Sequence, residues 1–210
     1  LETKLYGLKN LELASCGLQI LPADFAQQVP GLRYLNLNFN ALQDLRPLLN
    51  ITNLQDLHLA GNRLSRLRKS MAVLSRMKEL RVVDMRGNPY TVGFYPPTSE
   101  MRLVSTKLDQ NDDTSETREG LPRDPYLLPP ANTEENKRYW QRLDEDTKLR
   151  RRVYELLLAD FCRGLKTVDG LDWDRGKVQV KDGTWQRLME LGLVKDQEVR
   201  SRRGTKTSMQ

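Results

Sequence analysis

The residue with the widest chemical range in this 210-residue chain is its single histidine, His58. A histidine held by a carboxylate can act as a general base, and Asp84 occupies the equivalent position of the next repeat described below. A base needs a nucleophile to activate, and the positions beside His58 in that pattern hold no serine, cysteine or threonine. We therefore interpret His58 as part of a binding surface.

Other catalytic and metal-binding patterns are missing from the sequence. It has no glycine-rich phosphate loop and no Gly-x-Ser-x-Gly nucleophile turn. Its two cysteines, Cys16 and Cys162, cannot form a zinc site or a disulfide framework alone. We expect a protein that is not an enzyme, that carries no cofactor or metal, and that works in a reducing, intracellular setting.

A leucine pattern explains how the candidate residues are positioned. The pattern is Leu-x-x-Leu-x-Leu-x-x-Asn, with Cys16 replacing the asparagine in the first copy and Val83 and Met85 replacing two leucines in the fourth. Its four copies begin at Leu8, Leu32, Leu54 and Leu80. These intervals fall in the range of about 20 to 29 residues used by leucine-rich repeats. The fold class predicted is α/β: a leucine-rich repeat solenoid with a short parallel sheet and an irregular or short-helical convex side.

The repeat register predicts which side chains face outward. Strand side chains alternate, so Leu57 and Leu59 point into the core while His58 points out of the sheet. The asparagine, or Cys16, turns inward to bond backbone groups. The curvature of a solenoid makes its concave side an extended binding face. The outward residues predicted to bind a partner, here called the concave set, are Glu12, Tyr34, Asn36, Asn38, Asp56, His58, Asp84 and Arg86.

A second candidate surface is basic. Six bases and no acid lie between Leu57 and Lys78: Arg63, Arg66, Arg68, Lys69, Arg76 and Lys78. Guanidinium groups match phosphate oxygens, so this basic set could contact a phosphorylated or acidic partner. Arg150, Arg151 and Arg152 form another cluster. A net charge of +6 and the lack of interleaved aromatic residues argue against nucleic acid.

The composition changes after the repeats, and four regions follow. Residues 1–97 hold the repeats, and residues 98–132 form a polar, partly disordered insertion that ends in a proline-rich segment. We expect that segment, around Leu128, to dock on the solenoid. Residues 133–173 form a helical C-terminal cap with a degenerate last repeat, and acids at 144–146 mark a break between two helices. Residues 174–210 extend the cap, with a short strand at 177–181 and a helix at 184–191, and end in a basic tail.

No apolar run approaches the ~18 residues that cross a bilayer, so we expect no membrane partner. The chain opens Leu1-Glu2-Thr3 without a charged-then-apolar leader, and we expect a piece of a longer protein.

The C-terminal half carries a family resemblance. Asn88-Pro89, the helix at 152–158 and Leu165 to Leu171 resemble the cap of short intracellular leucine-rich repeat proteins. The run from Met85 to Pro97, the long insertion, Arg138-Tyr139-Trp140 and the segment 154–171 together look like the C-terminal domain of fungal spindle-pole-body scaffolds of the septation initiation and mitotic exit networks. That family is centriolin-like.

The resemblance implies a scaffold in the cytoplasm and cytoskeleton, at the spindle pole body or microtubule-organising centre. Such a scaffold docks on a spindle-pole anchor protein and recruits GTPase, GAP and kinase-activator components. Two alternatives stay open: an RNA-associated repeat protein of the spliceosomal type, and a regulatory subunit of a phosphatase.

Overall fold

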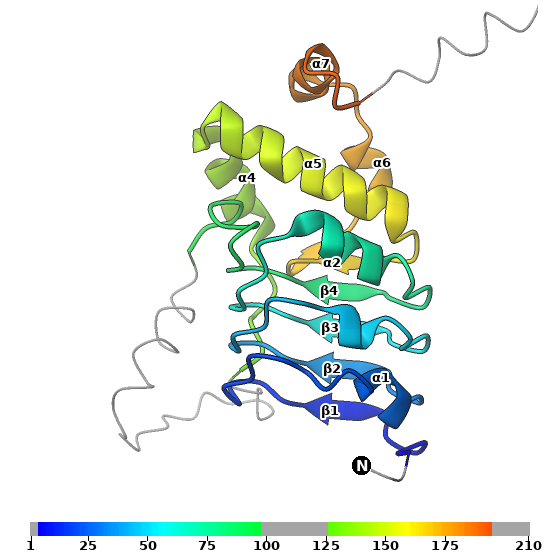
Figure 1. The fold of residues 1–210 in the computed structure, drawn as a ribbon. Coiled ribbons are helices and arrows are strands. Elements are labelled where there is room, and N and C mark those ends of the chain that lie inside the picture. Colours follow the sequence, from blue (N-terminus) through cyan, green and yellow to red (C-terminus); the bar gives the residue numbers. More distant parts are fainter. Residues whose placement is uncertain (1–3, 98–125, 195–210) are drawn as a thin grey trace, which may run out of the picture.

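A computed structural model of the chain describes residues 4–97 and 126–194 (Figure 1). One six-stranded sheet runs through both parts, with its strands in the order β1 to β6. The strands are β1 (Asn10–Glu12), β2 (Tyr34–Asn36), β3 (Asp56–His58), β4 (Val82–Asp84), β5 (Thr167–Val168) and β6 (Leu171–Asp172). Strands β1 to β5 pair in parallel, and β6 turns back antiparallel to β5. The predicted solenoid is confirmed.

The repeat register sets the core. Leu35 pairs with Leu57, and Leu57 pairs with Val83; all three side chains are fully buried. The convex side carries α1 (Phe25–Gln28), the 3-10 helix η1 (Arg46–Leu48) and α2 (Leu67–Leu74). Each repeat therefore buries its apolar face against its neighbours, as expected for a solenoid.

The inward asparagines form a ladder that joins the repeats. Asn62 donates to the carbonyls of Leu37 (2.9 Å) and Leu59 (3.0 Å), and its Oδ1 accepts from Leu42 N (3.0 Å). Asn40 and Asn88 make equivalent bonds in the neighbouring repeats. The prediction for Cys16 is wrong: it is exposed, and its thiol lies 3.4 Å from the Ala14 carbonyl in its own turn.

The cap covers the end of the sheet beyond β4. It contains α4 (Thr133–Arg142), α5 (Glu145–Phe161), β5, β6, α6 (Arg175–Val178) and α7 (Gly183–Glu190). The predicted helix break is present because the Asp144 carboxylate caps α5 by accepting from Thr147 N. Tyr154 and Leu158 of α5 are fully buried and belong to the same core as the repeat leucines. Figure 1 shows α5 lying across the last repeats beside α2.

Two predictions for the C-terminal half have different outcomes. The strand at 177–181 is wrong: residues Arg175–Val178 form α6, because Asp174 accepts from Gly176 N and Lys177 N and so begins a helix. The helix at 184–191 is confirmed as α7. The polar region 98–125 and the basic tail from 195 lie outside the described residues.

Candidate functional site

The concave set is less open than the sequence predicts. Glu12 is exposed, and Tyr34 and Asp56 are half-buried. The other five members are buried, with exposed fractions between 0% and 9%: Asn36, Asn38, His58, Asp84 and Arg86. These five side chains are therefore covered rather than open in this structure, and their binding of a partner stays a prediction.

The chain's own residues 126–131, here called the strap, cover part of this face. Asn38 Nδ2 donates to the Tyr126 carbonyl at 2.9 Å, and Arg86 Nη1 donates to the Pro129 carbonyl at 3.1 Å. At its far end, Ala131 N donates to the Gly170 carbonyl at 2.8 Å. Figure 1 shows the strap passing the carboxyl ends of the strands on its way to α4. The predicted docking of the segment around Leu128 is confirmed, since Leu128 is 6% exposed.

Proline chemistry explains why the strap stays extended. Pro129 and Pro130 have fixed φ angles, and each disfavours a helical conformation in the residue before it. Prolines lack an N–H, so the strap cannot pair as a strand here, and its carbonyls bind side chains instead. Asn132 follows the strap, and its side chain caps α4 by accepting from Glu134 N and Glu135 N.

A buried ion pair lies beneath the strap. Arg86 Nε is 3.0 and 3.1 Å from the two Asp84 oxygens, and both side chains are about 95% buried. Burial disfavours the charged guanidinium, but Asp84 outweighs this, and the pKa of Arg86 is raised. Arg86 is thus held charged, with one amino group available for the strap carbonyl.

Asp169 follows β5 and lies next to this pair. Its Oδ1 accepts from Met85 N at 2.6 Å, in the place where a further strand would offer a carbonyl. Its Oδ2 accepts from the hydroxyls of Tyr95 and Tyr154, both at 2.7 Å. Complete burial, followed by the charge of Asp84, raises the pKa of Asp169 to about 6. The sequence pattern gives no sign of the part that this aspartate plays in the core.

His58 lies in an aromatic contact. Its ring and the Tyr34 ring have centroids 5.3 Å apart, and its exposed fraction is 9%. Burial raises the pKa of the neighbouring Asp56, while the charge of His58 opposes this. Sequence reasoning brings Tyr34, Asp56 and His58 together correctly, and partner binding by Glu12, Tyr34 and Asp56 stays a prediction.

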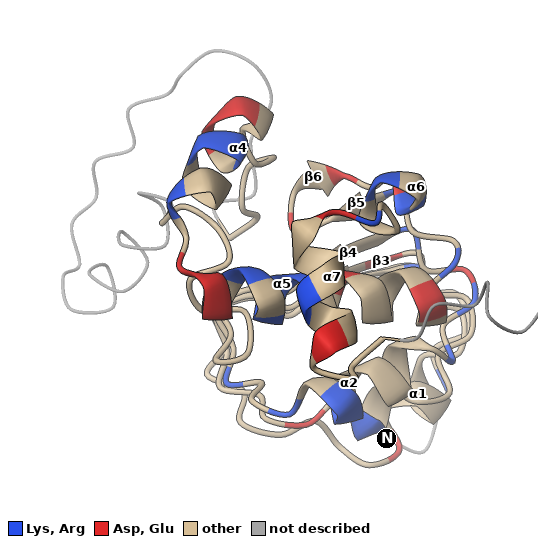
Figure 2. Cartoon of the chain, turned by 90° about the horizontal axis from the view of Figure 1, so that it is seen from above, with Lys and Arg blue, Asp and Glu red and all other residues tan. Residues whose placement is uncertain are grey.

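The basic set is exposed at every position. It divides into two groups, because α2 lies between Arg66 and Arg76 and is about 12 Å long at 1.5 Å per residue. Figure 2 shows Lys and Arg around α2 and on the N-terminal half of α5. The basic set is therefore two small clusters rather than one patch.

The arginine cluster on α5 is mostly structural. Arg151 donates to the Phe94 carbonyl at 2.6 Å and to Asn136 Oδ1 at 3.0 Å, and its guanidinium lies 4.4 Å from the centre of the Tyr95 ring. Arg152 is 7% exposed and donates to the Val180 carbonyl. Arg150 is the exposed member of this cluster, and it donates to the Val92 carbonyl at 3.0 Å.

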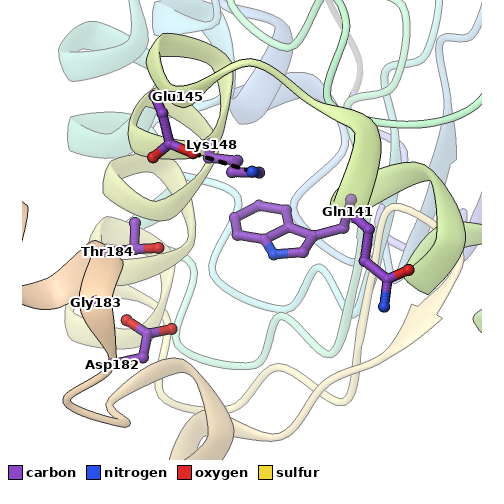
Figure 3. Close-up of a pocket in the computed structure, with 7 residues that line it drawn as sticks. Gln141, Glu145, Lys148, Asp182, Gly183 and Thr184 are labelled. Atoms are coloured by element: carbon purple, nitrogen blue, oxygen red, sulfur yellow. Dashed lines mark hydrogen bonds and ion pairs between the residues drawn. The ribbon is translucent and has the colours of Figure 1, made fainter.

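A hollow of about 420 Å³ opens on the outer side of the cap, between α4, α5 and the start of α7 (Figure 3). Trp140 forms one wall, and the ion pair of Glu145 with Lys148 (3.1 Å) forms another. Asp182 faces them from the start of α7. This mixture suits a polar side chain of a partner.

Among residues 4–97 and 126–194, no group of three or more metal-binding side chains is present. No helix in those ranges is long and apolar enough to cross a bilayer.

Comparison with known proteins agrees with this architecture. A leucine-rich repeat family model matches residues 7–64. The chain therefore has a leucine-rich repeat fold, and its residues 7–64 are similar to the leucine-rich repeat family. The chain is 26% identical over 174 residues to the septation initiation network scaffold protein cdc11 of Schizosaccharomyces pombe, which covers 79% of this chain. The resemblance to a septation scaffold is therefore present along most of the chain.

Two further likenesses concern trophoblast glycoprotein. The Macaca fascicularis protein is 40% identical over 112 residues, which is 52% of this chain. The solved human protein is 38% identical over 40% of this chain and 31% of its own, with a TM-score of 0.35. This chain matches 16% of the length of cdc11 and 26% of the Macaca protein.

Proposed function

We propose that this chain is the partner-binding region of a septation-type signalling scaffold. The observation that carries the proposal is the similarity to cdc11 over 174 residues. That length exceeds the repeat match at 7–64, so it includes sequence that generic leucine-rich repeats do not share. The fold supports the same role, since a curved solenoid offers extended surfaces to other proteins.

The more specific role that we propose is the one implied by the resemblance to septation scaffolds. The chain docks on an anchor protein at the spindle pole body, and the scaffold gathers GTPase, GAP and kinase-activator components there. It works by binding rather than by catalysis.

A gene replacement tests this role. In Schizosaccharomyces pombe, the matched region of cdc11 is exchanged for this chain, and septation and the position of the tagged hybrid are recorded. We expect the hybrid to reach the spindle pole and to support septation. A hybrid that is present at normal levels but achieves neither contradicts the proposal.

Two surfaces remain for the anchor protein. The open part of the concave set offers Tyr34, an aromatic of the kind that dominates many interfaces, and Asp56 beside it. The other surface is the basic cluster Arg63, Arg66, Arg68 and Lys69 at the start of α2.

Paired variants in the hybrid distinguish these surfaces. If the concave set binds, Tyr34→Ala with Asp56→Ala lowers recovery of the anchor protein by about tenfold or more. If the basic cluster binds, Arg66→Glu with Arg68→Glu has that effect, and raised salt mimics it. Arg76→Glu with Lys78→Glu, at the other end of α2, is the matched charge control.

Salt also tests the RNA-associated alternative. Binding to RNA weakens steeply as the salt concentration rises, because the counterions that binding releases then enter a more concentrated solution. An interface centred on Tyr34 changes little between about 50 and 200 mM salt. A steep dependence that persists in the Arg66→Glu, Arg68→Glu variant contradicts both protein surfaces.

A further inference from the structure

The strap is held through its backbone. Two of its carbonyls, those of Tyr126 and Pro129, accept from the side chains of Asn38 and Arg86. Its Tyr126 and Leu127 side chains are 39% and 40% exposed, and Leu128 is its only strongly buried side chain. A contact of this kind depends on an extended backbone and one apolar anchor rather than on a particular sequence.

The spacing of the two donors matches an extended proline-containing chain. Asn38 and Arg86 occupy the same position of the repeats that contain β2 and β4, since Tyr34 pairs with Asp56 and Asp56 with Val82. Strands lie about 4.8 Å apart, so these two positions are about 10 Å apart. A polyproline-type chain advances about 3.1 Å per residue, which places carbonyls three residues apart at about 9 Å. Tyr126 and Pro129 have that separation.

The residues between and beyond the donors leave room for such a chain. Ala60 holds the equivalent position in the repeat of β3, over which the strap must pass, and its side chain is a single methyl group. Gly170 lies at the far end with φ +78°, and a Cβ there would lie 2.8 Å from Ala131 N. Asn38, Ala60, Arg86 and Gly170 together form what we call the track.

We propose that the track is a binding site for extended, proline-containing segments of partner proteins, and that the strap is its resident, exchangeable occupant. This deepens the proposed scaffold role by naming the chemistry of a partner segment: a carbonyl at each end of a three-residue step, with a leucine-like anchor before two prolines. Displacing the strap exposes Asn38 and Arg86 together, the two buried donors that the sequence assigned to the partner face.

Peptide exchange on the full chain tests the proposal without any cellular partner, so its result is independent of the septation experiment. The probe is a labelled peptide with the sequence of residues 126–132, and binding is followed by fluorescence anisotropy. Leu128→Asp puts a charge into the buried anchor site and releases the strap. Because a tethered occupant competes at a high effective concentration, we expect the probe to bind this variant at least about tenfold more tightly than the parent.

Matched substitutions locate the bound probe. Asn38→Asp keeps the oxygen that accepts from Ala60 N but loses the Nδ2 donor, so in the Leu128→Asp background it should weaken probe binding about tenfold. Asn53→Asp is the control, because Asn53 Nδ2 donates to the Pro30 carbonyl away from the track. A peptide with alanine in place of both prolines should bind several-fold more weakly, because it is not pre-ordered.

The outcomes that overturn the proposal are specific. One is a Leu128→Asp variant that melts cooperatively yet does not bind the probe; another is an equal effect of the Asn38 and Asn53 substitutions. If Leu128→Asp does not fold, Pro129→Gly with Pro130→Gly releases the strap without a buried charge, and the same comparisons apply.

Discussion

The Asp169 carboxylate has three roles in the structure: it accepts from Met85 N, it binds two tyrosine hydroxyls, and it lies fully buried near Asp84. Its pKa of about 6 lies above the unfolded value of 3.8, so the folded state binds this proton more tightly than the unfolded chain does. The contribution of Asp169 to stability is therefore greatest below pH 3.8 and is lost as pH rises to about 6.

Asp169→Asn removes this titration. The amide oxygen still accepts from Met85 N, and the amide group can donate to a tyrosine oxygen. We expect the free energy of unfolding of the variant, measured relative to that of the parent, to increase steadily between about pH 4 and pH 6, because only the parent loses stability as Asp169 ionises. Urea melts across this range measure the difference, and a difference independent of pH contradicts the assignment.

Leu59 tests the register at the level of one side chain. It is fully buried between repeats, so Leu59→Ala should lower the free energy of unfolding by about 2–5 kcal/mol through loss of contacts and a cavity. Leu49→Ala is the control, because Leu49 is 36% exposed and should cost under about 1 kcal/mol. Equal costs in denaturant melts would show that the inward position of Leu59 is wrong.

At the scale of elements, the track depends on the turn between β5 and β6. Gly170→Ala adds a methyl group 2.8 Å from Ala131 N at a positive φ, so it should strain the turn and detach the strap. Gly17→Ala is the matched control, since Gly17 has φ +67° and no atom within 4 Å. Hydrogen exchange at the Ala131 amide should accelerate in the first variant alone; equal protection in both refutes the clash.

The elements that the sequence predicts well are those that depend on a repeating pattern of side chains. The asparagine ladder follows from one amide at a fixed position, because each amide bonds to the chain of its own and the neighbouring repeat. The path of the strap cannot be predicted from the sequence in the same way, because Asn38 and Arg86 bind backbone carbonyl groups, which every residue carries. The alternation at 177–181 was misleading for a related reason: the capping bonds of Asp174 decide the local conformation.

The sequence predicts which face of the sheet carries the candidate site, but it does not predict whether that face is exposed or covered. Periodicity places Tyr34, Asp56 and His58 on one face correctly, but it does not show which segment covers that face. In the sequence, Asn38 and Asp84 look free to bind a partner. The residue that Asn38 contacts, Tyr126, is distant in the chain, and the residue that Asp84 contacts, Arg86, belongs to the same predicted surface.

At the scale of the whole molecule, the repeats and the cap share one core, and an uneven distribution of tryptophan makes this measurable. All three tryptophans, Trp140, Trp173 and Trp185, lie in the cap. Leu35→Ala opens a cavity in the second repeat, yet we expect it to lower the denaturant midpoint seen by tryptophan fluorescence as much as that seen by circular dichroism. A fluorescence midpoint that stays at the parent value would show that the cap unfolds separately.

The bond between Met85 and Asp169 also has a consequence for biosynthesis. The repeats assemble from contacts between neighbouring turns of the solenoid, but the residue that accepts from Met85 N follows it by 84 positions. At ~5–20 residues per second, the ribosome takes roughly 4 to 17 s to deliver it. During that interval the edge at Val83 and Met85 lacks its cover, so the speed of translation between β4 and β5 sets how long the nascent solenoid is open to association with other chains.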